Sequence, residues 1–312
     1  GKEEAMSYKI TNIEYGIGPW GTEFLYGMVG NPKPDQIEQN VHSVTLIQAE
    51  DGTNILVDTG VDTDDPVKKE LWDSLITCCH GVAWALEQVG LVPEDIDIVI
   101  LTHAHLDHIG GVQRFANARV YIQQEEFEAW ERMSTDPAYA QLTLPAAMAS
   151  DYPPMRRMID EGRLVLLNGD VINFLPGIDL RVARNCHSLV EQMVVVRNEE
   201  SAAAATTLVN EQGDRVVCSV LSGGSSRTRT YIIGGDIAQR PANLTGMGDW
   251  KGYLAPILGR SGSALNLFKT YEWILQQIDG DMSRLVLTHD STMGERFESK
   301  PTADGLAIHY VC

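Results

Sequence analysis

The segment THAHLDHIGG, residues 102–111, places three histidines and one aspartate within six consecutive positions. The whole chain contains only eight histidines, so chance explains this concentration poorly. Imidazole and carboxylate groups are the ligands that zinc and similar divalent cations take at about 2.0 to 2.2 Å. The segment therefore predicts a metal site.

The spacing within this segment favours two metal positions. His103 and His105 lie two residues apart, so their side chains leave an extended segment on the same side, whereas Asp107 and His108 point elsewhere. The apolar run 98–101 precedes them and is typical of a buried strand. The predicted ligands thus stand at the end of a strand, which is a rigid platform for a metal site.

Three later strand candidates also end in a metal-binding residue. LRVARNC is followed by His187, TYIIGG by Asp236 and RLVLT by His289. If these strands lie side by side, the predicted ligands number seven, which suffices for two metals when one carboxylate is shared: His103, His105, Asp107, His108, His187, Asp236 and His289. The remaining histidines, His42, His80 and His309, are expected to be separate core or surface residues.

Alternating strand and helix patterns run along the whole chain and predict one α/β domain over residues 1–312. Strands are expected at 41–48, 54–60, 97–103, 118–123 and 163–168, and again at 178–184, 191–197, 214–221, 230–235 and 283–289. Helices are expected at 65–90, with Cys78 and Cys79 as buried thiols, and at 263–278.

Three segments are expected to elaborate this core. They are an aromatic loop at 17–34, a helical insertion at 125–162 and a hairpin at 201–229. Aromatic loops often shape a ligand pocket, so Trp20, Phe24 and Tyr26 are predicted to wall the substrate site.

The amino-acid composition limits the kinds of partner that this chain is expected to bind. The formal net charge of −19, from 43 acidic and 24 basic residues, disfavours nucleic acids and anionic membrane surfaces. Five cysteines without a CxxC pair favour a reduced compartment, and no apolar run approaches the length of a membrane span. The sequence thus predicts a cytoplasmic protein that acts on a small molecule, with a homodimer as the candidate assembly.

The segment from Thr102 to Gly111 matches THxHxDHxGG, the signature of the metallo-β-lactamase superfamily, which this chain resembles over most of its length. LVDTG at 56–60 resembles the strand-ending element of that family, which makes Asp58 the expected partner of a metal-binding imidazole. The resemblance implies a four-layer αβ/βα sandwich with two mixed sheets. It also implies two divalent ions, zinc first and otherwise manganese, iron or cobalt.

The same resemblance assigns the ligands. His103, His105 and His187 would hold one ion, and Asp107, His108 and His289 the other, with Asp236 between them. Two cations that share a water lower its pKa towards neutrality and place the resulting hydroxide beside an electrophile. Asp107 and Asp236 are the expected catalytic carboxylates, and Asp107 can pass a proton to the leaving group.

Within the superfamily, the ending LTHDSTMG resembles the N-acyl homoserine lactone lactonases. This implies a hydrolase of a small lactone, ester or cyclic amide. The chain departs from the lactonase pattern at Asn185-Cys186, Val190 and Gln239, where a tyrosine is expected, and Gln239 becomes a candidate substrate contact. The alternatives are hydrolysis of a thioester, an organophosphate or an aryl substituent, or a metal-binding protein without catalysis.

Overall fold

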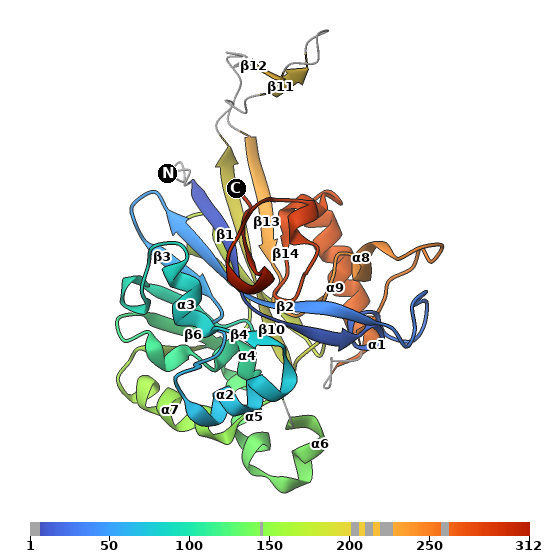
Figure 1. The fold of residues 1–312 in the computed structure, drawn as a ribbon. Coiled ribbons are helices and arrows are strands. Elements are labelled where there is room, and N and C mark those ends of the chain that lie inside the picture. The colour runs from blue at the N-terminus through green and yellow to red at the C-terminus, as the bar shows by residue number, and fades with distance from the viewer. Residues whose placement is uncertain (1–6, 144–145, 201–205, 210–214, 219–226, 257–261) are drawn as a thin grey trace.

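The computed structural model describes residues 7–143, 146–200, 206–209, 215–218, 227–256 and 262–312. Two sheets form its centre (Figure 1). The larger sheet has the order β15-β16-β1-β2-β3-β5-β6-β7, with the short β4 paired to β1. Its strands are β1 (Tyr8–Gly21), β2 (Ile37–Ala49), β3 (Asn54–Val57), β4 (Cys78–Cys79), β5 (Ile98–Ile100), β6 (Arg119–Gln123), β7 (Leu164–Leu167), β15 (Glu298–Pro301) and β16 (Ala307–Tyr310).

The second sheet has the order β14-β13-β10-β9-β8. Its strands are β8 (Val171–Leu175), β9 (Ile178–Arg184), β10 (Val190–Glu200), β13 (Arg227–Ile233) and β14 (Leu285–Val286). Within the segment 201–229, where a hairpin is expected, β11 (Thr206–Val209) and β12 (Arg215–Cys218) form an antiparallel pair. The predicted turn at 211–214 and the link at 219–226 lie outside the described residues.

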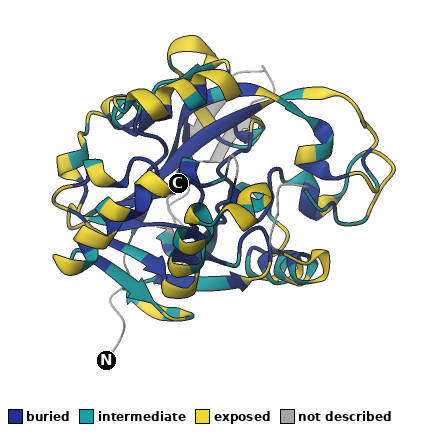
Figure 2. Cartoon of the chain, turned by 90° about the horizontal axis from the view of Figure 1, so that it is seen from below, coloured by how far each residue is buried: buried dark blue, intermediate teal, exposed yellow. Residues whose placement is uncertain are grey.

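Helices cover the outer face of each sheet, and Figure 1 shows α2, α3, α5 and α7 on one side and α9 on the other. The helices are α1 (Thr22–Tyr26), α2 (Pro66–Leu75), α3 (Gly81–Glu87), α4 (Leu106–Ile109), α5 (Gln124–Thr135), α6 (Ala140–Thr143), α7 (Tyr152–Asp160), α8 (Ala242–Thr245) and α9 (Ala264–Gln277). Figure 2 shows the strands largely buried and the outer helix surfaces exposed.

The period-two pattern of the strands creates these layers. On β2, Ile47 faces the core between the sheets, whereas its neighbour Leu46 faces the helices outside. On β10 the same alternation directs Val194 between the sheets and Val195 towards α9. Because both faces of each sheet are covered, the predicted αβ/βα sandwich is confirmed.

The single helix predicted over 65–90 is wrong. The chain forms α2 and α3, and between them Cys78 and Cys79 form β4, which pairs with β1. Gly81 adopts φ 80°, which favours glycine, and a Cβ there would lie 2.7 Å from Thr63 Oγ1. A continuous helix is thus interrupted, and the two half-buried thiols belong to a strand.

The loop predicted at 17–34 is only partly present. β1 continues to Gly21 and pairs with β2 as far as Ile37, and α1 follows directly. Pro19 fits because this end of β1 has a neighbouring strand on one side only, so no ladder hydrogen bond is lost. The segment 125–162, for which a helical insertion is expected, includes α6, α7 and all of α5 except its first residue, Gln124.

Candidate metal centre

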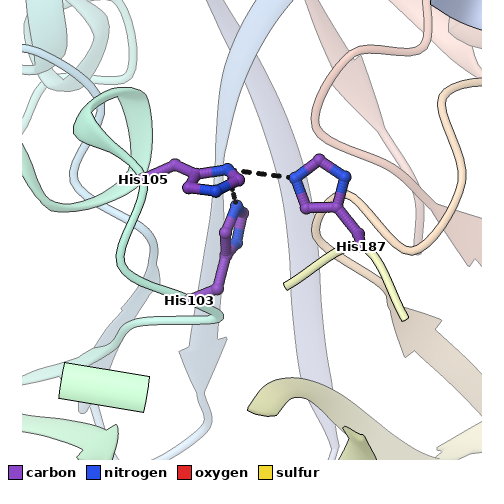
Figure 3. Close-up of side chains that lie close together, drawn as sticks. All are labelled: His103, His105 and His187. Atoms are coloured by element: carbon purple, nitrogen blue, oxygen red, sulfur yellow. Dashed lines mark hydrogen bonds between the residues drawn. The ribbon is translucent and has the colours of Figure 1, made fainter. Parts of the chain in front are cut away.

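The first three predicted ligands meet at one point (Figure 3). His105 Nδ1 lies 2.9 Å from His103 Nε2 and 3.0 Å from His187 Nε2. His103 and His105 belong to the segment between β5 and α4, and His187 lies in the loop between β9 and β10. Two donors on a tetrahedral zinc ion stand about 3.3 Å apart, given bonds of about 2.0 to 2.1 Å. These three nitrogens are therefore close to the arrangement that one ion needs.

A second group lies beside the first. His289 Nε2 is 3.3 Å from Asp107 Oδ2, and His108 Nε2 is 3.7 Å from Asp107 Oδ1. Asp107 and His108 are on α4, whereas His289 follows β14. One carboxylate and two imidazoles thus face each other across the space at the end of the strands.

Asp236 lies between the two groups. Its Oδ2 is 3.4 Å from His187 Nε2 and 3.1 Å from His289 Nε2, while its Oδ1 is 3.3 Å from His108 Nε2. The residue follows β13, which pairs in parallel with β14, so these two strands deliver Asp236 and His289 to the same edge. All seven predicted ligands are brought together.

The donor set fits divalent cations. His108 Nε2 and Asp236 Oδ1 are buried, and neither atom has a hydrogen-bond partner among the described residues. A buried polar atom without a partner carries a large desolvation cost, which a bound cation would remove. Imidazole with carboxylate suits zinc, iron, cobalt or manganese rather than calcium.

The protonation states of these groups favour the binding of a cation. Burial lowers the pKa of His103 and His105 well below 6.5, so both imidazoles stay neutral and keep a free lone pair. Burial alone would raise the pKa of Asp236, but its histidine neighbours hold it well below 3.8. Burial also opposes the protonation of His289, yet Asp236 and Asp107 raise its pKa to about 9. A cation would replace that proton.

Two ligands are oriented through their second nitrogen. Asp58 Oδ2 lies 2.7 Å from His108 Nδ1, and Asp58 Oδ1 accepts from the Thr102 amide at 2.7 Å. His289 Nδ1 lies 2.8 Å from the carbonyl oxygen of Val41. Each contact aims the Nε2 atom at the centre, so Asp58 occupies the orienting position that the sequence suggests.

Glu126, on α5, was missed by sequence reasoning. This buried carboxylate accepts hydrogen bonds from the Ala104 and Val190 amides, at 3.1 and 2.8 Å, and from the Ser188 hydroxyl. It therefore fixes both loops that carry the first three histidines. The sequence did contain a sign that Glu126 is buried, because it lies four residues before Trp130 and therefore on the same face of the helix.

The departures at 185–190 have a structural explanation. Asn185 adopts φ 51°, a left-handed conformation that asparagine tolerates better than most residues with a Cβ. The backbone amide of Asn185 donates to the backbone carbonyl of Leu189, and this bond closes the loop around His187. Val190 is buried at the start of β10 and bonds through its amide to Glu126. Asparagine and a side-chain carboxylate thus hold the loop here.

A cavity of about 350 Å³ opens onto the centre. Its walls are mainly apolar, and its floor contains five of the predicted ligands; it is lined by Pro19, Trp20, Gly21, Phe24, Trp72, Leu75, His105, Leu106, Asp107, Ala146, His187, Asp236 and His289. Trp20 and Phe24 lie where the sequence predicts. Trp72 and Leu75, from α2, were missed, because nothing in the helical pattern of α2 shows that its end faces the ligands.

Two predicted substrate contacts are wrong. Tyr26 is buried away from the cavity, where its hydroxyl lies 2.8 Å from Glu38 Oε2 and its ring packs beside Leu25 and Leu254. Gln239 is fully buried and does not line the cavity. Its Nε2 donates to Asp236 Oδ2 at 3.4 Å, so the side chain supports a predicted ligand instead of a substrate.

Asp58→Asn is expected to weaken metal affinity about 10- to 100-fold with little change in fold. The side-chain amide of asparagine has one acceptor oxygen. The Asp58 carboxylate uses two, which contact the Thr102 amide, the Thr102 hydroxyl and His108. Competition with a chelator would measure the dissociation constants. Asp97→Asn, at the exposed end of the same sheet, is the matched control. Equal affinities in the two variants would contradict the orienting role.

The metal-free protein is expected to lose stability as the pH falls from 6.5 towards 4. Burial, only partly opposed by Asp236, lowers the pKa of His187 from 6.5 to about 4. Within that window the unfolded chain binds a proton that the folded protein excludes, so the free energy of unfolding falls. Urea unfolding at several pH values would measure the slope. His187→Gln should reduce the slope by the share of one proton, because His103 and His105 still contribute to it, and an unchanged slope would disprove the assignment.

Comparisons with known proteins agree with this fold. Residues 38–176 match the family model of the metallo-beta-lactamase superfamily. The N-acyl homoserine lactonase of Bacillus cereus is 27% identical over 174 residues, which are 52% of this chain and 61% of that protein. N-acyl homoserine lactonase AiiB of Agrobacterium fabrum is 34% identical over 93 residues, which are 27% of this chain and 33% of that protein.

The matches therefore span from one third to about three fifths of the length of these two relatives. Among solved structures, AidC, a dizinc quorum-quenching lactonase, superposes with a TM-score of 0.61 at 16% identity and covers 98% of this chain and 95% of its own. That likeness shows a shared fold. Residues 38–176 thus match the metallo-β-lactamase superfamily, and the sandwich around them is the fold of that superfamily.

Proposed function

We propose that this protein is a two-metal hydrolase that opens the carbonyl group of a small lactone, ester or cyclic amide. The observation that carries the proposal is the convergence of seven predicted metal ligands, five of which line an apolar cavity, with Asp236 shared between two groups. A structural metal site is usually closed by protein ligands, whereas a catalytic one keeps access for substrate. The open cavity therefore favours catalysis over metal binding alone.

The proposed cofactors are two divalent cations, with zinc as the first choice. His103, His105 and His187 would hold one, and Asp107, His108 and His289 the other, with Asp236 in contact with both. When bound, such ions supply an activated water and a Lewis acid for a carbonyl oxygen. The orienting contacts from Asp58 and Val41 keep the ligand nitrogens aimed at them.

Asp107 is the group proposed to move a proton. Its side chain is 15% exposed and lines the cavity, whereas the Asp236 side chain is 5% exposed. Burial would raise the pKa of Asp107, but His108 and His289 hold it well below 3.8, so the carboxylate is ionised. At the cavity floor it can pass that proton to the leaving oxygen or nitrogen.

The cavity favours a neutral substrate with an apolar substituent. No lysine or arginine is among the described residues that line it, and aromatic and aliphatic side chains form its walls. The two curated relatives act on N-acyl homoserine lactones according to their names. The buried Gln239 takes the place of the lactonase tyrosine, so a carbonyl-orienting hydroxyl is missing there. We therefore propose the broader class, with thioesters, phosphotriesters and aryl compounds as alternatives.

A small molecule is the proposed partner. Within the described residues, no helix is both long and apolar enough to cross a membrane. The cytoplasmic location and the homodimer suggested by the sequence stay predictions.

Turnover of at least one lactone, ester or cyclic amide is expected from the zinc-loaded protein, with loss on chelation and recovery on adding zinc. Asp236→Ala should lower turnover about a thousandfold or more, because cation stabilisation of a transition state is worth several kcal/mol. Asp73→Ala, at an exposed pair with Lys69, is the control. Turnover is measured by screening the protein and both variants against lactones, esters and cyclic amides, together with thioesters and phosphotriesters. Full activity of Asp236→Ala would rule out the proposed site.

Trp20→Ala and Phe24→Ala should each raise the KM about tenfold, because each ring contributes apolar surface to the substrate cavity. Tyr26→Phe is the matched control, since that ring lies two residues from Phe24 but packs away from the cavity. Steady-state kinetics on the best substrate measure the effect. An unchanged KM in both alanine variants would show that substrate binds elsewhere.

A further inference from the structure

His42, on β2, lies against the second group of predicted ligands. Its Nδ1 is 3.4 Å from Asp107 Oδ2, and its ring meets the His289 ring edge-on with centroids 4.7 Å apart. The side chain is fully buried, and neither ring nitrogen has a hydrogen-bond partner among the described residues. On its other sides it meets the rings of Tyr15, Trp20 and Trp72. The sequence expectation of a separate core histidine is therefore wrong.

A second buried histidine shows what a purely structural role looks like in this chain. His309 has both nitrogens in hydrogen bonds, with Ser299 Oγ at 2.7 Å and with Glu14 Oε1 at 2.9 Å. Buried polar groups in folded proteins nearly always find such partners. His42 is just as buried and has neither, so its nitrogens need a partner that none of the described residues provides.

The distances around Asp107 indicate that partner. Asp107 Oδ2 lies 3.4 Å from His42 Nδ1 and 3.3 Å from His289 Nε2. Two donor atoms on one tetrahedral zinc ion stand about 3.3 Å apart. The nitrogen and the oxygen are thus separated as ligands of a common ion are, and at 3.4 Å their contact is longer than a usual hydrogen bond.

We infer that His42 is a further metal ligand, which binds the ion at the second position together with Asp107 and His289. The inference rests on the proposed two-metal centre and adds a residue to it. With His108 and Asp236, the second position would have three imidazole and two carboxylate ligands, whereas the first has three imidazoles and Asp236. The second position would then suit an ion that accepts five or six ligands, such as iron, manganese or cobalt, better than a strictly tetrahedral one.

Nuclear magnetic resonance of cadmium-113 bound to protein with nitrogen-15 histidine tests this directly, because only a coordinated imidazole nitrogen couples to the metal nucleus. With two equivalents of cadmium, six coupled imidazoles are expected: His42, His103, His105, His108, His187 and His289. Five couplings without His42 would overturn the inference and leave the two-metal centre standing. No couplings would contradict the two-metal centre itself. The count uses the unaltered protein and does not depend on a variant folding.

Two variants assign the sixth coupling. His42→Phe should reduce the count to five and raise the dissociation constant of the second zinc ion at least about tenfold, the loss that removal of even an orienting partner causes. His80→Phe is the matched control, because His80 belongs to a separate surface group with Cys78 and Asp304 that could also hold cadmium. A sixth coupling that disappears in His80→Phe and persists in His42→Phe would overturn the inference.

Discussion

The structure depends on the placement of two carboxylates, the buried Asp236 and the mostly buried Asp107, among five imidazoles at one edge of the sandwich. Unpaired charges are costly to bury, so Asp107 and Asp236 must be neutralised from close range. In the metal-free protein His289 does this in part, because the two carboxylates raise its pKa to about 9 despite burial. A cation at the same place neutralises the carboxylates without the proton. The surrounding residues hold these groups together although removing charged groups from water costs free energy.

The topology makes that convergence possible. β3 and β5 run in parallel, so Asp58 and the segment that begins at Thr102 leave the first sheet at the same edge. β13 and β14 do the same for Asp236 and His289 in the second sheet. Ligand sites in α/β proteins form outside the carboxyl ends of parallel strands, and here both sheets contribute their ends to one site. Glu126 then connects the two loops through backbone amides, which side-chain substitutions on those loops leave in place.

The sequence predicted the parts that depend on local spacing. Alternating apolar residues located most strands, and the candidate ligands were recognised because the segments that contain them each follow an apolar run. What it could not predict depends on contacts between distant segments. His42 sits in an ordinary strand pattern, and only the pairing of β2 with β1 and the return of the chain at His289 reveal its neighbours. Tyr26 and Phe24 look equivalent in sequence, yet α1 directs one ring into the core and the other to the cavity.

The cavity wall and the metal ligands are not independent parts. Trp20 lines the cavity and also stacks on the ring of His289, with centroids 6.2 Å apart and planes 28° apart. Trp72 likewise lines the cavity and meets the His42 ring edge-on at 5.1 Å. A substitution that reshapes the wall for another substrate therefore also changes the packing that fixes these imidazoles. Close packing transmits such changes, so substrate preference and metal retention are physically coupled in this chain.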